Sequence, residues 1–358
     1  MTTTDLAPSR AALDPDAVAE RLLGIVNDGG IAILGSIGYS TGLFETLGSL
    51  PPATSEQIAD AAGLDERYVR EWLGGVVTAA LVRYDPATRT YWLDEDYRPF
   101  VTGAGVDNLI RMTRMITLMS QVVPQIVEKF RTGGGLSYHD YEGFHDAMAE
   151  ESAAVNDAAL LDVIIPLTGL VDGLRSGLDV ADVGCGEGHA VNLLGREFPA
   201  SRFTGIDFSD DALVAGRAEA SAWGLTNVRF ETQDAATISD TGAYDLVLAF
   251  DAIHDQAHPA RVLANIHRSL RAGGTFLMVD INASSNLEEN LETPWASFLY
   301  AASLTHCMSV SLGQGGDGLG TVWGVQTAER MLREAGFRTV VRHDLEDDPF
   351  NAYFVATT

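Results

Sequence analysis

The feature that most constrains this chain is a run of glycines at alternate positions, Asp182-Val-Gly184-Cys-Gly186-Glu-Gly188. It follows a short apolar segment of strand character and leads directly into a helical pattern. Glycine lets the backbone turn tightly and lets a ligand approach without meeting a Cβ, and the helix that follows presents unpaired N–H groups. A dinucleotide site requires Gly-x-Gly-x-x-Gly, but the third glycine position falls on His189 or Val191. The turn therefore predicts a site for a nucleoside other than a dinucleotide.

Strand-like and helix-like segments alternate from Leu178 to the end of the chain. The expected strands are residues 178–183, 202–207, 228–232, 244–250, 275–281, 339–344 and 352–356, and helical patterns such as 190–197 and 212–223 separate the earlier ones. This alternation predicts an α/β fold with a Rossmann-like, doubly wound, seven-stranded sheet. Only residues 345–351 separate the last two strands, so we expect a hairpin there and an antiparallel final strand.

The N-terminal hundred residues carry a different pattern. Residues 14–48 are helical in character and apolar on nearly every side, so they need more than one partner surface. Thr54 and Gln57 match a capping box, and a second helix begins at Asp65. Segments 81–84 and 90–93 then predict a β-hairpin. This order predicts an α-helical winged-helix domain over residues 1–100. Residues 101–170 are expected to form a helical linker that contributes to the active site, and residues 171–358 a ligand-binding domain.

Charge and composition exclude several classes of protein. The chain carries 23 Lys and Arg against 50 Asp and Glu, a net charge of −27. Such a field repels nucleic acid and anionic membranes. Within residues 51–100, five arginines against nine acidic residues leave −4, so we interpret the winged helix as a dimerisation module of a homodimer rather than a reader of DNA. Lysine occurs only at Lys129, which excludes a P-loop.

The N-terminus and the cysteines indicate in which cellular compartment the protein is expected. Residues 1–10 are polar and lack the apolar core of a signal peptide, and the nearby apolar run Ile31–Leu34 is too short to span a bilayer. Two cysteines, one of them inside the glycine turn, imply no disulfide framework. We therefore expect a cytoplasmic protein.

Together, the glycine turn and the polar residues at later strand ends resemble the class I S-adenosylmethionine-dependent methyltransferases. The chain is most similar to bacterial, mycobacterial-type small-molecule enzymes with an N-terminal winged-helix domain, and this resemblance covers it from about Val18 onward. It implies that residues 171–358 bind S-adenosyl-L-methionine. The cofactor-binding residues that the resemblance implies are Asp182, Gly184, Gly186 and Gly188 in the turn, Asp207 for the ribose hydroxyls, Phe208, Asp234 and Ala235 for the adenine, Phe250 at the methyl-transfer side, and Tyr141 in a segment that closes over the cofactor.

His254 is the candidate catalytic base. It follows the expected strand 244–250, and open α/β sheets bind their ligands at the carboxyl ends of the strands. A hydroxyl acceptor must lose a proton, and histidine titrates near neutral pH. Asp255 either orients the imidazole or binds substrate. His139, His145 and His306 are competing bases, and a structural or substrate-positioning role for His254 stays open.

The spacing of His254 and His258 also suits a zinc pair, but there is no glutamate beside the first histidine. Pro259 prevents a shared helix, so no metal is expected. The leading interpretation is methyl transfer to a small apolar or aromatic acceptor, most simply at oxygen. The alternatives are a winged-helix transcriptional regulator whose methyltransferase-like domain senses a ligand, and a metal hydrolase. The glycine-rich segment 313–320 predicts a loop that acts either as a lid or as ordinary surface.

Overall fold

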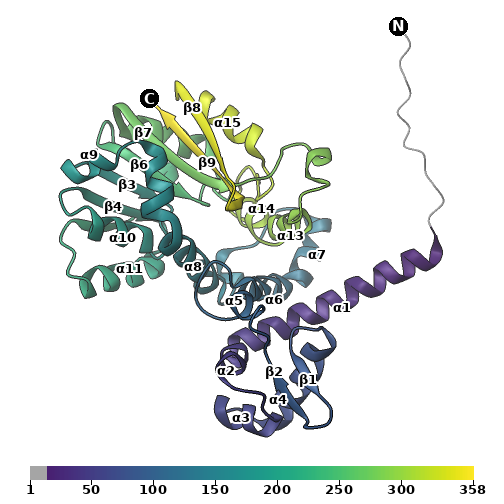
Figure 1. The fold of residues 1–358 in the computed structure, drawn as a ribbon. Helices are drawn as coiled ribbons and strands as arrows, with labels where there is room; N and C mark the ends of the chain where they lie inside the picture. The colour runs from purple at the N-terminus through teal and green to yellow at the C-terminus, as the bar shows by residue number, and fades with distance from the viewer. Residues whose placement is uncertain (1–13) are drawn as a thin grey trace. The chain divides into compact units, whose positions relative to one another are not determined.

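The computed structural model describes residues 14–358, which divide into two compact units (Figure 1). The first ends at Thr117 and the second runs from Leu118 to Thr358. The interpretation of residues 1–10 as lacking a signal peptide lies outside the described residues.

The first unit contains a winged-helix region built as the sequence predicts. Its elements are α1 (Pro15–Ser40), α2 (Leu43–Ser49), α3 (Ser55–Ala62), α4 (Glu66–Thr78), the hairpin β1 (Arg83–Asp85) and β2 (Thr90–Trp92), α5 (Arg98–Val101), η1 (Leu109–Met112) and the start of α6 (Thr113–Gln121). The capping box forms, since the Thr54 hydroxyl accepts from the Gln57 N–H and the Gln57 side chain accepts from the Thr54 N–H. Val69, Trp72, Leu73 and Val76 form the buried face of α4.

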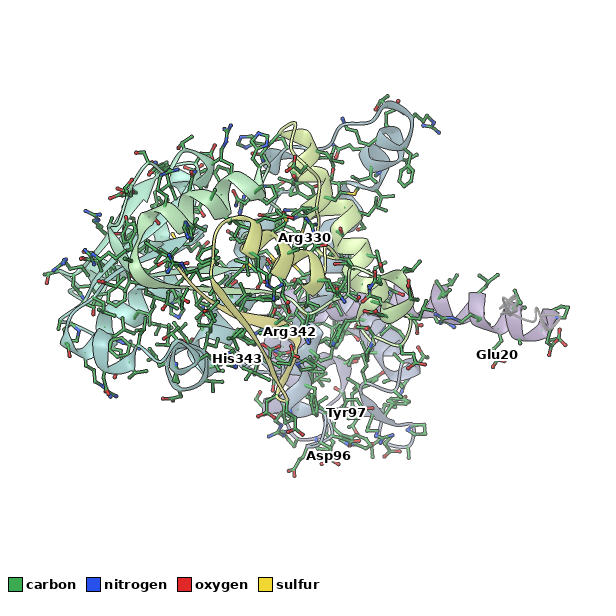
Figure 2. The ribbon with its side chains drawn as sticks, turned by 90° about the horizontal axis from the view of Figure 1, so that it is seen from above. Glu20, Asp96, Tyr97, Arg330, Arg342 and His343 are labelled. Atoms are coloured by element: carbon green, nitrogen blue, oxygen red, sulfur yellow. The ribbon has the colours of Figure 1, made fainter. Side chains whose placement is uncertain are left out.

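Helix α1 is apolar yet largely exposed over its N-terminal half. Its buried residues, Ala32, Gly35, Ser36 and Gly38, all lie near its C-terminal end. Large exposed apolar side chains run along the whole helix, also between those buried residues: Val18, Leu22, Leu23, Ile25, Val26, Ile33 and Ile37. Figure 2 shows this half, marked by Glu20, carrying its side chains outward. By length and composition alone, α1 meets the criteria for a helix that crosses a membrane, a test that core helices and signal sequences also pass.

The second unit opens with helical segments and then forms the predicted sheet. The helical part comprises α7 (Val123–Thr132), η2 (Tyr138–Asp140), α8 (Phe144–Val155), the π-helix η3 (Asn156–Ile164), η4 (Ile165–Thr168) and α9 (Val171–Ser176). The strands are β3 (Asp179–Val183), β4 (Arg202–Asp207), β5 (Val228–Thr232), β6 (Tyr244–Phe250), β7 (Leu270–Ile281), β8 (Thr339–Leu345) and β9 (Asp348–Thr357). Their spatial order is β5-β4-β3-β6-β7-β9-β8.

The antiparallel final strand is confirmed. Strand β9 pairs antiparallel with both β7 and β8, while β3 to β7 pair in parallel. The link between β8 and β9 is shorter than predicted, since only residues 346 and 347 lie between them. The fifth strand begins earlier than the predicted residue 275, because Leu270 already pairs with Tyr244 and a register shift absorbs the residues before Thr275.

Helices cover both faces of the sheet (Figure 1), which explains why the strands are apolar on both sides. Alternate residues of one strand enter different cores: Val180 packs with α10 (His189–Glu197), and Ala181 with α12 (Pro259–Ser269) and α15 (Val325–Glu334). The other elements are α11 (Asp210–Ala222), η5 (Ala235–Thr237), η6 (Leu287–Asn290), α13 (Ala296–Ala302), the π-helix η7 (Ser303–Cys307) and α14 (Met308–Gly313).

Candidate functional site

The glycine turn joins β3 to α10 in the conformation that the sequence predicts. Gly184, Gly186 and Gly188 all have positive φ, at 76°, 54° and 73°. A Cβ at Gly184 would lie 2.5 Å from the Ala252 Cβ, and one at Gly188 would lie 2.2 Å from the Phe230 ring. A Cβ at Gly186 would meet nothing within 4 Å. Two glycines are therefore required by packing, and Gly186 presents bare backbone to open space where a ligand can approach.

Asp207 ties the next strand end to this turn. Its Oδ2 accepts the Gly186 N–H at 2.9 Å, and its Oδ1 accepts the Ser209 N–H at 2.9 Å. Burial raises the pKa of this carboxyl, and the Ser209 and Gly186 N–H groups oppose the rise. Each carboxylate oxygen keeps lone-pair capacity for one more donor. The group can thus accept from two neighbouring hydroxyls, as a ribose presents them. The adjacent Phe208 ring is half exposed and free to stack on a base.

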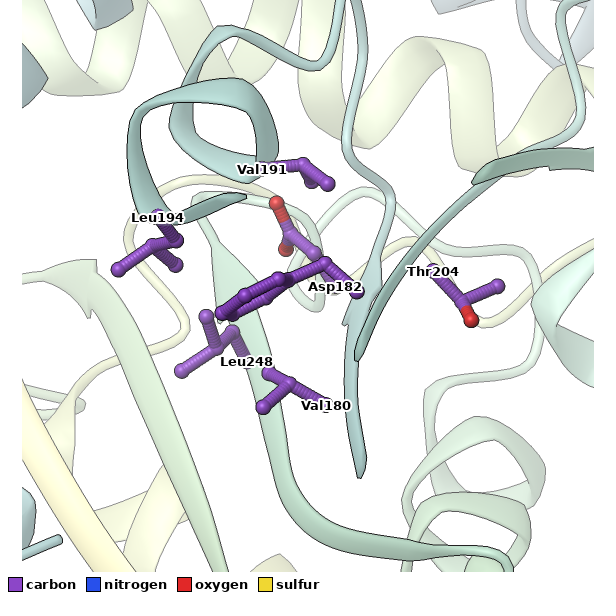
Figure 3. Close-up of a pocket in the computed structure, with 7 residues that line it drawn as sticks. Val180, Asp182, Val191, Leu194, Thr204 and Leu248 are labelled. Atoms are coloured by element: carbon purple, nitrogen blue, oxygen red, sulfur yellow. The ribbon is translucent and has the colours of Figure 1, made fainter. Parts of the chain in front are cut away.

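Asp182 lies deeper than the turn it begins. Figure 3 shows its side chain beside a narrow space lined by apolar side chains such as Val180, Val191 and Leu248. One carboxyl oxygen has no hydrogen-bond partner. Burial, with the neighbouring Asp207 charge, raises the pKa of Asp182 to about 8. Its contact with a cofactor stays a prediction, as does that of Phe250 at the end of β6.

The predicted adenine-edge pair lies after β5. Asp234 caps η5 by accepting the Ala236 N–H at 2.8 Å, and the side chain of Ala235 is buried in the core. The Ala235 carbonyl accepts from Asn265 Nδ2 at 3.1 Å. These contacts order the loop at the carboxyl end of the sheet. They do not involve adenine, so the assignment of Asp234 and Ala235 to the adenine edge remains a prediction.

His254 is held by a carboxylate that sequence reasoning missed. Its Nδ1 lies 2.8 Å from Asp280 Oδ1, and both side chains are almost fully buried. The same oxygen accepts from Trp323 Nε1 at 3.0 Å and from the Ile281 N–H at 2.8 Å. Burial lowers the pKa of His254, but Asp280 and Cys307 outweigh it and raise that pKa well above its usual value. The one sequence signal for this carboxylate was the presence of an aspartate inside the apolar run of strand β7.

Backbone strain lies next to this histidine. Asp251, directly after β6, is a partly buried non-glycine residue with a φ of 49°. One of its carboxyl oxygens has no partner. Burial, with the charge of Asp280, raises its pKa to about 7. Strained backbone of this kind clusters at functional sites.

Asp255 does not orient the imidazole. Its Oδ2 accepts the Tyr138 hydroxyl at 2.8 Å, whereas Asp280 bonds His254. Of the two roles predicted for Asp255, orientation is therefore wrong, and substrate binding stays a prediction. The Tyr138 ring also packs against Phe208 at 5.2 Å. The Tyr141 hydroxyl donates to the Thr305 carbonyl, and the predicted contact of Tyr141 with the cofactor stays a prediction.

An aromatic cluster surrounds His306 on η7. Its ring stacks on Phe144 at 3.7 Å and meets Tyr141 edge-on at 4.8 Å, with Tyr138 at 5.6 Å. His145 stacks on the other end of the cluster, 5.4 Å from Tyr138. Burial lowers the pKa of His306 to about 3, helped by the nearby His254 and His145. A histidine that weakly basic is a poor proton acceptor at neutral pH, which leaves His254 ahead of His306.

The positions of His254 and His258 decide whether the two histidines could form a zinc pair. His258 is the N-cap of α12, while His254 lies in the preceding loop against Asp280, so the two histidines do not share a helix face. Among residues 14–358, no group of three or more His, Cys, Asp or Glu side chains is placed to hold a metal ion.

The glycine-rich segment 313–320, predicted as a loop, packs against the His254 loop. The Asp317 N–H donates to the Ala257 carbonyl, and the Gly320 N–H donates to the His254 carbonyl.

Known proteins share both regions of the chain. Residues 174–336 match the family model described as a methyltransferase domain, and residues 29–103 match that of the Rv2258c-like winged HTH domain; together the matches span more than half of the chain. A phthiotriol/phenolphthiotriol dimycocerosates methyltransferase 1 of Mycobacterium ulcerans is 30% identical over 114 residues, which are 32% of this chain and 41% of that protein. A trans-aconitate 2-methyltransferase of Methylobacterium nodulans is 29% identical over 144 residues, 38% of this chain and 53% of that protein. The chain thus matches only about half or less of these curated relatives.

Solved structures share the fold over nearly the whole chain. A candidate O-methyltransferase from Nostoc punctiforme superimposes with a TM-score of 0.73 at 19% identity, covering 97% of this chain and 100% of that chain. Human N-acetylserotonin methyltransferase in complex with SAM gives 0.68 at 16% identity, covering 97% and 99%. At these identities the likeness shows the architecture, including the helical N-terminal region and the seven-stranded sheet.

Proposed function

We propose that this chain, which belongs to the S-adenosylmethionine-dependent methyltransferases with an N-terminal winged helix-turn-helix domain, transfers a methyl group to a hydroxyl of a small acceptor. The observation that carries the proposal is the buried His254–Asp280 pair, at 2.8 Å, at the carboxyl end of the central strands. The same sheet edge carries the glycine turn. The proposed nucleoside site and the proposed proton acceptor would therefore share one edge, as methyl transfer to oxygen requires.

The residues of the turn fit S-adenosylmethionine. Asp207 has acceptor capacity for both ribose hydroxyls, Phe208 offers a ring face to the adenine, and Gly186 leaves backbone room for the ligand. When bound, the cofactor supplies a methyl group on a sulfonium, which a nucleophile attacks in line. The protein's part is to hold the two reactants in that geometry and to remove the acceptor proton.

His254 takes the proton of the acceptor hydroxyl in this proposal. Because Asp280 occupies Nδ1, that nitrogen carries the N–H and Nε2 remains the accepting atom of the neutral ring. Asp280 also stabilises the imidazolium that forms. The raised pKa of His254 makes it a stronger base than an ordinary histidine, and it requires a pH high enough to deprotonate the resting ring.

The acceptor is proposed to be aromatic or apolar. Tyr138, Tyr141, Phe144 and His306 present ring faces and edges in one cluster, and Tyr138 connects that cluster to Asp255, next to His254. Flat apolar rings pack well against such side chains. One structural relative is a mitomycin 7-O-methyltransferase, whose name describes chemistry of this kind on a small molecule.

The test combines binding and turnover. The full chain should bind S-adenosylhomocysteine by calorimetry and transfer labelled methyl to members of a panel of phenols and alcohols. Gly186→Val should abolish both by filling the open side of the turn. A wild-type protein that binds S-adenosylhomocysteine, methylates nothing in the panel and shifts DNA would instead support the ligand-sensing regulator.

The proposal includes a homodimer formed through α1 and a cytoplasmic location. Leu22 and Leu23 are 59% and 62% exposed, on a helix that leaves an apolar face uncovered. A second copy of the chain would bury that face, and an obligate interface typically exceeds ~2,000 Å². Leu22→Glu should lower the mass measured by light scattering. The control Leu287→Glu, at a residue 62% exposed outside α1, should leave it unchanged. A monomeric wild type at micromolar concentration, or one that partitions onto vesicles, would contradict the proposal.

A further inference from the structure

His306 on η7 carries an open polar atom within the aromatic cluster. The side chain is 4% exposed, and its Nε2 has no hydrogen-bond partner among the residues that the structure describes. The two tyrosine hydroxyls of the cluster already have acceptors. Tyr138 donates to Asp255, and Tyr141 donates to a backbone carbonyl of η7. Buried polar atoms without partners are rare, and a ligand atom is one group that completes such a network.

The surroundings of the other ring nitrogen indicate where the proton of His306 lies. Its Nδ1 is 3.6 Å from the Cys307 sulfur, and that sulfur accepts from the Thr321 hydroxyl at 3.0 Å. The thiol proton is therefore available to Nδ1, and a neutral imidazole that accepts at Nδ1 carries its own proton on Nε2. Burial lowers the pKa of His306 to about 3, so the ring is uncharged at neutral pH. Nε2 is thus a neutral hydrogen-bond donor without an acceptor.

The packing of η7 brings this donor near the proposed base. Gly320 lies between η7 and the His254 loop, because its N–H donates to the His254 carbonyl and a Cβ on it would lie 2.2 Å from the Ser303 hydroxyl oxygen. Tyr138 makes a second connection. Its ring meets His306 at 5.6 Å, and its hydroxyl bonds the residue that follows His254.

The charges around the strand ends select the kind of atom that the donor can take. The carboxyls of Asp207, Asp255 and Asp280 all follow or end strands at this edge, and the chain carries a net charge of −27. An anionic partner would be repelled by this field. A carbonyl oxygen accepts from N–H without bringing a charge into the apolar cluster. The donor therefore fits a neutral carbonyl better than a carboxylate.

We infer that His306 is a specificity-determining residue, and that the acceptor is an aromatic hydroxy compound with a neutral carbonyl oxygen that the Nε2–H of His306 binds. The inference rests on the proposed methyl transfer to a hydroxyl. His306 holds the carbonyl while His254 takes the proton of the hydroxyl, so the acceptor is fixed at two points and its oxygen is oriented for attack. An acceptor without the carbonyl leaves the buried N–H unpaired, which disfavours it.

The test compares the ortho, meta and para isomers of hydroxyacetophenone with those of ethylphenol, which have nearly the same shape but no carbonyl. The wild-type full chain should prefer the ketone of at least one isomer pair by on the order of tenfold or more in kcat/KM. The matching hydroxybenzoate, which places a carboxylate there, should be a poorer substrate than the ketone. Calorimetry of the same compounds with the S-adenosylhomocysteine complex measures binding without turnover.

Variants separate the hydrogen bond from the ring, and they also cancel the effect of the carbonyl on the acidity of the phenol. His306→Phe keeps a ring against Phe144 but has no N–H, so the preference for the ketone should shrink by about tenfold, mainly through KM. His306→Gln keeps an N–H near the position of Nε2 and should restore part of the preference. His267→Phe is the matched control, because this ring also meets a phenylalanine, Phe337 at 5.1 Å, but from α12. It should leave the preference unchanged.

Nitrogen NMR of the labelled wild type should place the proton of His306 on Nε2, and a proton on Nδ1 would overturn the inference. So would a folded His306→Phe protein with the wild-type preference, or a wild type that binds ketone and ethylphenol equally or binds neither. If His306→Phe does not bind S-adenosylhomocysteine, the Gln variant and the NMR measurement decide. A wild type that prefers the ketone in binding but methylates no isomer would contradict the proposed methyl transfer and leave the contact at His306 intact.

Discussion

The carboxyl edge of one sheet carries two functional regions that are built in different ways. At the glycine turn, residues 182–188 act mainly through backbone, with three positive φ angles within seven consecutive residues. At His254 the groups are side chains, and they come from the loop after β6, from β7 and, through Trp323, from the segment before α15. The first region is local in sequence, and two of its three glycines leave no room for a Cβ. The second depends on how distant segments pack, so substitutions should affect the two regions differently.

The electrostatics of the regions differ as well. Asp182 is buried at the turn with no cation beside it, and its pKa rises to about 8. Asp280 is equally buried but lies against His254, and it accepts three hydrogen bonds at one oxygen. A buried carboxyl without a partner destabilises the fold. A buried carboxyl that bonds a titratable side chain can instead shift the pKa of that side chain toward a value suited to a reaction. Substitutions at Asp280 should therefore change the reaction, and those at Asp182 the stability of the fold.

The largest expected effect is on turnover at the side-chain region. His254→Ala should lower kcat for a phenol or alcohol by about 10²–10⁴-fold while S-adenosylhomocysteine binding is kept. The wild-type rate should rise with pH through a midpoint above the ordinary histidine value, because the pKa of His254 is raised, and the variant should lose that limb. The measurement is the pH–rate profile of both proteins on one substrate. If both show the same limb, the base is another residue.

Asp280→Asn should have a smaller effect on the same reaction, on the order of 10–100-fold in kcat, because the base itself remains. Removing the carboxylate charge should also move the pH midpoint downward, which loss of packing alone would not do. Asp255→Asn is the matched control: its carboxyl bonds Tyr138 and not His254, so the midpoint should move less. A larger shift for Asp255→Asn would reverse the two assignments.

At the backbone region, Asp207→Ala should weaken S-adenosylhomocysteine binding by about 1–3 kcal/mol, because ligand hydroxyls and the Gly186 N–H lose their acceptor. Calorimetry checks this value. Binding as tight as that of the wild type, in a protein that still folds, would place the ribose elsewhere.

The smallest effect is on stability. In the unfolded chain Asp182 ionises near its ordinary value of 3.8, but in the fold it keeps its proton up to about pH 8. Between these values the unfolded state releases a proton that the folded state retains, so stability falls as pH rises. Asp182→Asn should therefore raise the melting temperature at pH 7 by at least ~2–4 °C, equivalent to about 1 kcal/mol. The difference should vanish below about pH 4. A lower melting temperature at pH 7 would mean that the ionised carboxyl is stabilising.

Local signals predicted most of the fold. Strands β4, β5 and β6 begin and end where their apolar patterns do, and the cap at Thr54 formed because both of its partners lie within three residues. The start of β7 was missed because residues 270–274 contain two glycines and pair through a register shift, which depends on the neighbouring strand.

The candidate site likewise has features that local sequence predicts and features that depend on tertiary contacts. The sequence by itself determined the glycine turn, Asp207 and the position of His254 at a strand end, because φ preferences and strand periodicity act over a few residues. The partners of His254 were decided only by the tertiary structure. Asp280, which bonds His254, is 26 residues away along the chain. Asp255, although adjacent in sequence, bonds Tyr138 instead. Side-chain contacts of this kind follow from strand order and helix packing, which local residue patterns do not encode.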